Sequence, residues 1–73
     1  MNLEIELVHE PEYTRWWANI DALPGVAAFG KTKEEAIKNV KEIALQDLLW
    51  QLEDGDLEDI EAVSFKIAEA IAA

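Results

Sequence analysis

The sequence predicts an α+β domain with the element order β-β-β-α-β. We expect a three-stranded antiparallel meander plus a fourth strand, with one long helix packed on one face of the sheet. Apolar and polar residues alternate at both ends of the chain, and a helix-capping sequence at Thr32 precedes a long stretch of helical periodicity. At 73 residues the chain has room for one domain, which we place at 1–73 without a separate DNA-binding domain.

The first strand is predicted from strict alternation. Leu3, Ile5 and Leu7 are separated by two glutamates, which is the pattern of a strand with one buried and one solvated face. The segment 9–13 interrupts this pattern with a proline, which cannot donate a hydrogen bond to a neighbouring strand. We therefore expect a surface connection there.

Two further strands follow. Residues 14–20 are rich in aromatic and β-prone side chains and alternate again, and 26–29 is a short third strand ended by Gly30. Between them, Pro24 presets φ for a type II turn and Gly25 supplies the positive φ that the next position requires. Consecutive strands with short links favour an antiparallel meander.

A long helix is predicted from Thr32 to about Glu53. The Thr32 hydroxyl can accept from the Glu35 amide while the Glu35 carboxylate reaches back to the Thr32 amide, and Gly55 suits the stop. One apolar stripe should cover the sheet: Ile37, Val40, Ala44, Leu48 and Leu52.

After an acidic connection at 56–61, alternation returns. Val63, Phe65 and Ile67 alternate with smaller or polar residues, which predicts the fourth strand. The final segment, 68–73, is apolar and helix-prone, and its role stays open between a frayed end and a docked one.

Charge and composition exclude several classes of function. Six basic residues against 16 acidic ones give a net charge of -10, which disfavours nucleic acids and anionic membranes and favours a basic protein partner. The absence of cysteine excludes disulfides, thiolate metal sites and a cysteine nucleophile. We see no signal peptide and no apolar stretch that approaches a membrane span, so we expect a cytoplasmic protein.

Candidate catalytic groups are few. Glu4 and Glu6 lie on one strand face, but the same face of the other strands offers no further acids for a metal site. His9 is the one possible neutral base and has no nucleophile arranged with it, so we interpret it as a surface-loop histidine. We predict no catalytic residue, no metal and no cofactor, and therefore a binding protein and not an enzyme.

Adjacent tryptophans provide one candidate for binding. Trp16 and Trp17 must point to opposite faces of their strand, so one can join the core and the other cannot. If Leu3, Ile5 and Leu7 face the helix, the remaining tryptophan, which we take to be Trp17, lies on the opposite face beside the glutamates. It either contacts a partner, packs on the long stem of Arg15 or Lys66, or lies under the carboxy-terminal segment.

The helix provides a second candidate. At about 100° per residue, Leu45 and Leu49 fall on one side of the main stripe, and Ile43 and Trp50 fall on the other. This apolar arc is wider than one sheet contact requires, and surplus apolar surface marks an interface unless the fourth strand and tail cover it. We predict that Leu45, Leu49 and Trp50 contact a partner or a second subunit, so a homo-oligomer is expected.

Two stretches resemble a known family. Residues 16–26 read W-W-A-N-I-D-A-L-P-G-V and residues 30–36 read G-K-T-K-E-E-A, which together resemble the amino-terminal domain of HicB-like antitoxins. The second motif matches at every fixed position. The first departs at Asp21, where the family usually has proline, and at Ala22, where it usually has aspartate, and both departures concern turn geometry.

The resemblance implies a partial ribonuclease-H-like fold and the inhibition of a small basic RNA-cleaving toxin of the HicA type. Many longer family members carry a carboxy-terminal DNA-binding domain, but few residues follow the helix here and they are acidic, so we expect no direct nucleic acid binding. The alternative is an orphan homo-oligomeric scaffold or regulatory domain that has no toxin partner.

Overall fold

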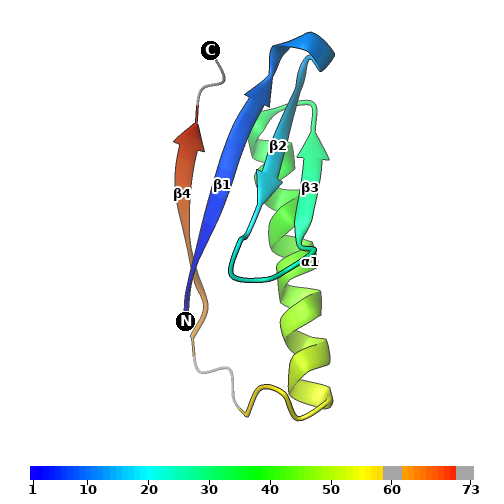
Figure 1. The fold of residues 1–73 in the computed structure, drawn as a ribbon, viewed down its shortest axis with the longest axis vertical. Coiled ribbons are helices and arrows are strands. Elements are labelled where there is room, and N and C mark those ends of the chain that lie inside the picture. The colour runs from blue at the N-terminus through cyan, green and yellow to red at the C-terminus, as the bar shows by residue number, and fades with distance from the viewer. Residues whose placement is uncertain (59–61, 71–73) are drawn as a thin grey trace.

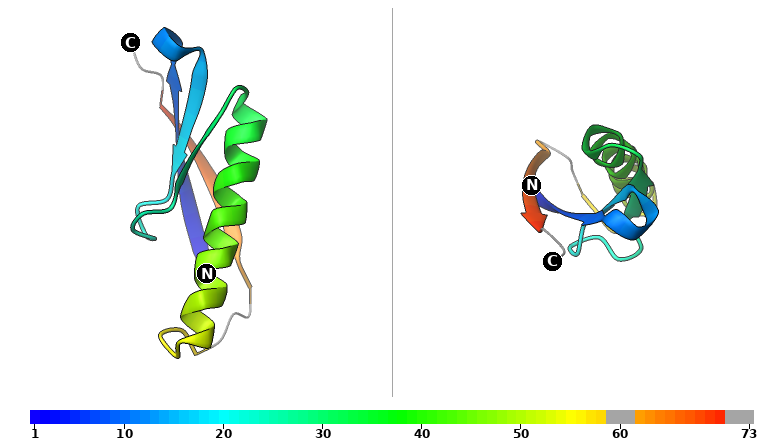
Figure 2. Two further views of the ribbon diagram at one scale, coloured as in Figure 1. Left: turned by 90° about the vertical axis from the view of Figure 1, so that its right-hand side faces the viewer. Right: turned by 90° about the horizontal axis from the view of Figure 1, so that it is seen from above.

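The predicted fold class is confirmed by the computed structural model, which describes residues 1–58 and 62–70 (Figure 1). The elements are β1 (Asn2–Glu10), a 3-10 turn η1 (Pro11–Tyr13), β2 (Arg15–Asn19), β3 (Ala27–Gly30), α1 (Lys33–Glu53) and β4 (Ser64–Ala70). The strands form one sheet in the order β3-β2-β1-β4, and α1 covers one of its faces (Figure 2).

The sheet is mixed because α1 connects its two edges. β1, β2 and β3 are antiparallel neighbours, as the short links predict. β4 pairs with β1 in the parallel sense, from Asn2 opposite Ser64 to Val8 opposite Ala70. A parallel return needs a long crossover, and α1 provides it between β3 at one edge and β4 at the other.

The core lies between α1 and the inner face of the sheet. Leu3, Ile5 and Leu7 are buried there, while Glu4 and Glu6 point to the solvated face, as the alternation predicts. No buried polar or charged residue occurs in the part of the chain that the structure describes. Burial of apolar area is therefore the main source of stability in this domain.

The first connection is shorter than predicted. His9 and Glu10 belong to β1, opposite Trp16 and Arg15, so the prediction of a loop histidine is wrong. The strand pairing continues to the end of β1, and only Pro11–Tyr13 and Thr14 make the turn. Thr14 closes it with a left-handed φ of 48°.

The predicted Pro24-Gly25 turn and both predicted helix ends are confirmed. Gly25 has a φ of 83°, and the Val26 amide donates to the Leu23 carbonyl at 3.0 Å. The Thr32 hydroxyl accepts from the Glu35 amide at 3.1 Å, and Gly55 follows the helix with a φ of 82°. The Glu35 carboxylate departs from the predicted capping box, because it accepts from the Lys31 amide at 3.4 Å.

The buried stripe of α1 differs from the predicted one at both ends. It consists of Ala36, Val40, Ala44 and Leu48, while Ile37 is half-buried. Leu52 is 37% exposed because the last turns of α1 extend past the sheet (Figure 1). Within the described residues, no helix has the length and hydrophobicity needed to cross a membrane.

The carboxy-terminal strand is longer than predicted. β4 begins at Ser64 and continues through Ala70, so the interpretation of 68–70 as helix-prone is wrong. Pairing with β1 along its whole length overrides the local helical preference of these alanines. The remainder of the predicted tail, 71–73, and part of the acidic connection, 59–61, lie outside the described residues.

Gly30 allows α1 to start directly against β3. A Cβ atom at this position would lie 2.3 Å from the Ala36 nitrogen and 2.9 Å from its Cα, both of them backbone atoms. Only a residue without a side chain fits there, because the helix backbone cannot move aside as a flexible side chain could. The glycine of the G-x-T-x-E-E-A motif therefore sets the distance between helix and sheet.

We predict that Gly30→Ala destabilises the domain by roughly 1–3 kcal/mol or more, the usual range for overpacking in a core. Urea denaturation followed by circular dichroism measures this change. Gly55→Asn is the matched control, because Gly55 has a positive φ that asparagine tolerates, and a Cβ atom at that position would meet nothing within 4 Å. Equal midpoints for wild type and Gly30→Ala would contradict the steric argument.

Candidate protein-binding surfaces

Large apolar side chains are exposed along the second half of α1. Leu45 is 46% exposed, Leu49 48% and Trp50 57%, and Ile43 is close behind at 42%. The three helix residues predicted to bind a partner are thus accessible in the monomer. Neither β4 nor the described part of the connection after α1 buries them.

These side chains form two separate surfaces. Leu49 and Trp50 are consecutive, so they diverge by about 100° around the helix axis. Leu45 and Leu49 follow Lys41 by successive turns, and Lys41 lies on the side of β4, with its Nζ 5.4 Å from the Phe65 ring centroid. We call Leu45 and Leu49 the leucine strip.

Trp50 and Ile43 belong to a groove on the other side of α1. Its volume is about 360 Å³. We call it the Trp50 groove, and its lining residues come from the β2–β3 turn and from α1: Pro24, Gly25, Val26, Glu42, Ile43, Gln46, Asp47 and Trp50. The groove combines apolar residues with two carboxylates, and Asp47 is held in place by a hydrogen bond of 2.8 Å from the Gln51 amide.

The two tryptophans of β2 point to opposite faces, as predicted. Trp16 lies on the inner face, where its ring centroid is 4.6 Å from that of His9 and it packs against the core. Trp17 lies on the outer face, 4.6 Å from the Phe29 ring centroid, and is half-buried. It is on the opposite side of the sheet from the leucine strip and the Trp50 groove, so the structure does not bring the four predicted residues together.

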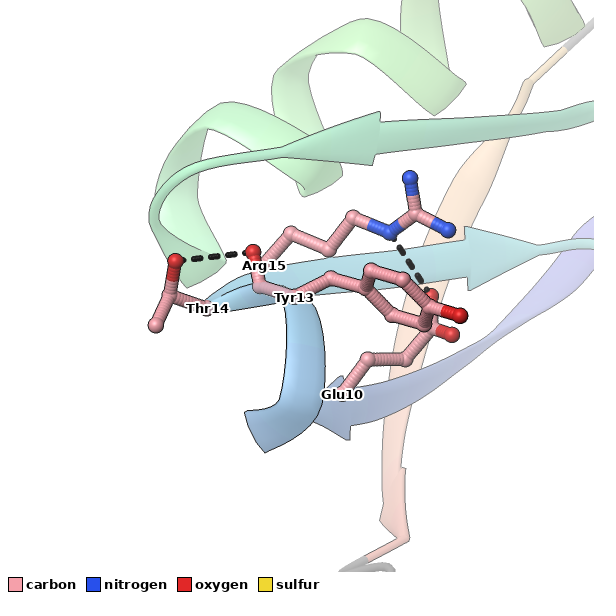
Figure 3. A network of polar contacts seen from close by, with 4 residues as sticks. All are labelled: Glu10, Tyr13, Thr14 and Arg15. Atoms are coloured by element: carbon pink, nitrogen blue, oxygen red, sulfur yellow. Dashed lines mark hydrogen bonds and ion pairs between the residues drawn. The ribbon is translucent and has the colours of Figure 1, made fainter.

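The outer face holds an arginine between aromatic rings. The Arg15 guanidinium carbon lies 3.9 Å from the Phe29 ring centroid and 4.6 Å from that of Tyr13. Its Nε donates to Glu10 at 3.1 Å, as Figure 3 shows beside the Thr14 hydroxyl that donates to the Tyr13 carbonyl. Phe29 and Tyr13 are 43% and 61% exposed, so they are more accessible than Trp17.

The residues considered for catalysis lie on different faces of β1, with Glu4 and Glu6 on the outer face and His9 on the inner one. The described residues contain no group of three or more His, Asp or Glu side chains that could hold a metal ion, and Glu4 and Glu6 lie on a solvated strand face. His9 stacks on Trp16 and has no nucleophile beside it that the structure describes.

Comparison with solved structures identifies a similar domain. The amino-terminal domain of the Burkholderia pseudomallei antitoxin HicB matches with a TM-score of 0.60 and 27% sequence identity. The match covers 85% of this chain and 67% of that one. This chain has a HicB-like fold. The resemblance predicted from the two sequence motifs is therefore confirmed.

Other comparisons add no second relative. No family model matches the chain, and neither does any curated protein. The HicB likeness thus depends on structure and on the modest identity that accompanies it.

Sequence reasoning missed part of each surface. The sequence indicates only a turn role for Pro24, and its place on the wall of the Trp50 groove depends on how the turn folds over α1. The exposure of Phe29 could have been inferred, because it alternates with the buried Ala28. The stacking of Tyr13 on Arg15 depends on the turn at Thr14, for which the sequence carries no clear signal.

We predict that neighbouring leucines of α1 respond differently to truncation. Leu48→Ala should lower the free energy of unfolding by roughly 2–5 kcal/mol, since Leu48 is 1% exposed and its truncation leaves a cavity in the core. The free energy of unfolding of Leu49→Ala should stay within about 0.5 kcal/mol of the wild-type value, as expected for an exposed position. Urea denaturation of the two variants tests this, and similar losses for both would mean that the leucine strip is buried in solution.

Proposed function

We propose that this chain is an antitoxin-like protein-binding module that neutralises a small basic RNA-cleaving toxin of the HicA type by forming a complex with it. The likeness to the HicB antitoxin domain supports this proposal most directly. The bound antitoxin would block access of RNA to the toxin. The module itself would carry out no reaction and would bind no nucleic acid, and we place its action in the cytoplasm, as its sequence predicts.

Charge supports a basic partner. The chain carries a net charge of -10, which accelerates encounter with a basic protein. Glu53, Asp54 and Asp56 surround the carboxy-terminal end of α1, where the helix dipole is negative and no basic residue occurs in the last turn. This placement is unfavourable for the helix, so helix stability does not account for it. A basic partner bound nearby would give these carboxylates a favourable interaction.

The Trp50 groove is the best site for such a partner. Trp50 is the most exposed large apolar side chain of α1, and tryptophan is a frequent anchor of protein interfaces. Glu42 and Asp47 flank it and could pair with lysine or arginine side chains. Apolar contact would then hold the complex, and the carboxylates would orient it.

An orphan homo-oligomeric scaffold or regulatory domain with no toxin is the alternative function. The leucine strip favours it, because this exposed apolar row follows Lys41, which lies over Phe65 of β4, on a different side of α1 from the Trp50 groove. A scaffold would self-associate and leave RNA cleavage by any neighbouring protein unchanged.

Mixing this chain with a small basic RNA-cleaving protein tests the leading proposal. We expect the chain to abolish RNA cleavage by the small basic protein encoded beside it, at a ratio of one to one, and to bind it more weakly as salt is raised. Unchanged cleavage at saturating concentration would exclude the antitoxin function. Self-association without inhibition would instead favour the scaffold.

Paired variants locate the site. Trp50→Ala should weaken toxin binding by roughly tenfold or more, since truncating an interface anchor removes about 2 kcal/mol or more of binding free energy. Leu49→Ala is the matched control, because Leu49 is another exposed apolar side chain of the same helix and lies on the other surface. Isothermal titration calorimetry gives both dissociation constants, and equal losses would argue against the Trp50 groove.

A further inference from the structure

β4 is an edge strand of seven residues that is only partly protected, because it carries Lys66 and Glu69 but contains no proline. β1 pairs with one side of it, and within residues 1–58 and 62–70 no strand pairs with the other side. Proteins usually shield such an edge with charge, proline or a covering element, because free backbone groups can bind another strand. Ile67, in the middle of β4, is instead 46% exposed.

The space beside this edge is apolar as well. Ile67 pairs with Ile5 and shares its face of the sheet, the face that α1 covers over β2 and β3. Seen from above, α1 and β4 lie on opposite sides of the molecule (Figure 2, right). The leucine strip faces this open side, because Lys41 on the same side of α1 already contacts Phe65 of β4. A second protein at the edge would cover Ile67 and the leucine strip together.

Charge indicates which protein fits. Three of the six basic residues lie near this edge: Lys41 over Phe65 and Lys33 in an ion pair with Glu69 are on the inner face, and Lys66 is on the outer face of β4. A strongly basic partner would be repelled by these lysines. A second copy carries a net charge of -10, and its repulsion from the first copy would be weaker at this edge than at the more acidic surfaces. The occupant that matches both the free strand and the charge is another copy of the chain.

Strand register narrows the arrangement further. A two-fold axis normal to the sheet makes the two β4 strands antiparallel and places residues of the same face opposite each other. A two-fold axis at Lys66 would place the two Lys66 side chains opposite each other. An axis at Ala68 would place Ile67 opposite Glu69 of the other copy. Centring on Ile67 places isoleucine against isoleucine and Lys66 against Ala68, with no like charges opposed.

We propose that two copies of this chain pair through β4, antiparallel about a two-fold axis at Ile67, to form a continuous eight-stranded sheet. The two leucine strips then lie on the same face, on either side of the Ile67 pair, and contribute the apolar part of the interface. The Trp50 groove lies on the other side of α1 and stays open. Pairing is thus independent of toxin binding, and one dimer could hold two partners.

A single cysteine tests the pairing without background, because the natural chain contains none. Directly opposed residues of antiparallel strands have Cα atoms about 4.5–5.5 Å apart, a separation that a disulfide spans. We expect Ile67→Cys to form a covalent dimer on mild oxidation, seen by non-reducing electrophoresis. Phe29→Cys is the matched control, since Phe29 is 43% exposed on β3, the other edge strand. Failure of Ile67→Cys to cross-link, or equal cross-linking of both variants, would overturn the proposal.

Sedimentation equilibrium provides the second measurement. The wild-type chain should show a mass that rises from monomer to dimer with concentration, and Ile67→Glu should raise the dissociation constant at least roughly tenfold, because two carboxylates would be opposed at the axis. Phe29→Glu should leave it unchanged. A wild-type chain that stays monomeric at the highest concentration would refute the dimer while leaving toxin inhibition untouched.

Discussion

The close approach of α1 to the sheet is the constraint on which the rest of this structure depends. Gly30 leaves no space for a side chain under Ala36, and the contact surface continues through other small residues, Ala18 and Ala28 on the sheet and Ala44 on the helix. Small residues let the two layers lie near each other, so the large side chains of the core, such as Ile5, Leu7 and Leu48, pack densely against the opposite layer.

The same constraint explains the exposed apolar surface. A helix held this close to a sheet buries one narrow row, here four residues spaced by one turn each. Larger side chains on either side of that row are excluded from the contact and remain in solvent, which is the position of Leu45 and Trp50. Close packing and surplus apolar surface are therefore two consequences of one geometry. The surplus apolar side chains divide between the leucine strip and the Trp50 groove because they lie on two different sides of the buried row.

Charge separates the roles that these flanks can take. The flank beside the β2–β3 turn carries Glu42 and Asp47 and leads to the acidic end of α1, which suits a basic partner. The flank beside β4 carries Lys41 and adjoins an edge strand whose outer side has no pairing strand within the described residues, which suits another copy of this chain. The HicB likeness supports the first role, and the edge geometry supports the second. Because the flanks lie on opposite sides of one helix, both interactions can occur at once.

Local patterns determined the elements of this protein. Alternation at Leu3, Ile5 and Leu7, the Pro24-Gly25 turn and the Thr32 cap each act through neighbouring backbone, so residues close in sequence were enough to predict them. The surplus of apolar residues on the helix could also be predicted from the sequence, because the helical period alone shows that one contact with a sheet cannot bury them all. Tertiary structure decided the rest. The extension of β1 through His9, the strand character of 68–70 and the exposure of Leu52 depend on which strand pairs with which and on where the sheet ends beneath the helix. The division between the Trp50 groove and the leucine strip likewise depends on the turn at Pro24 and on β4, both distant from α1 in sequence. Interactions between distant segments have no local signature, and only the folded chain places them together.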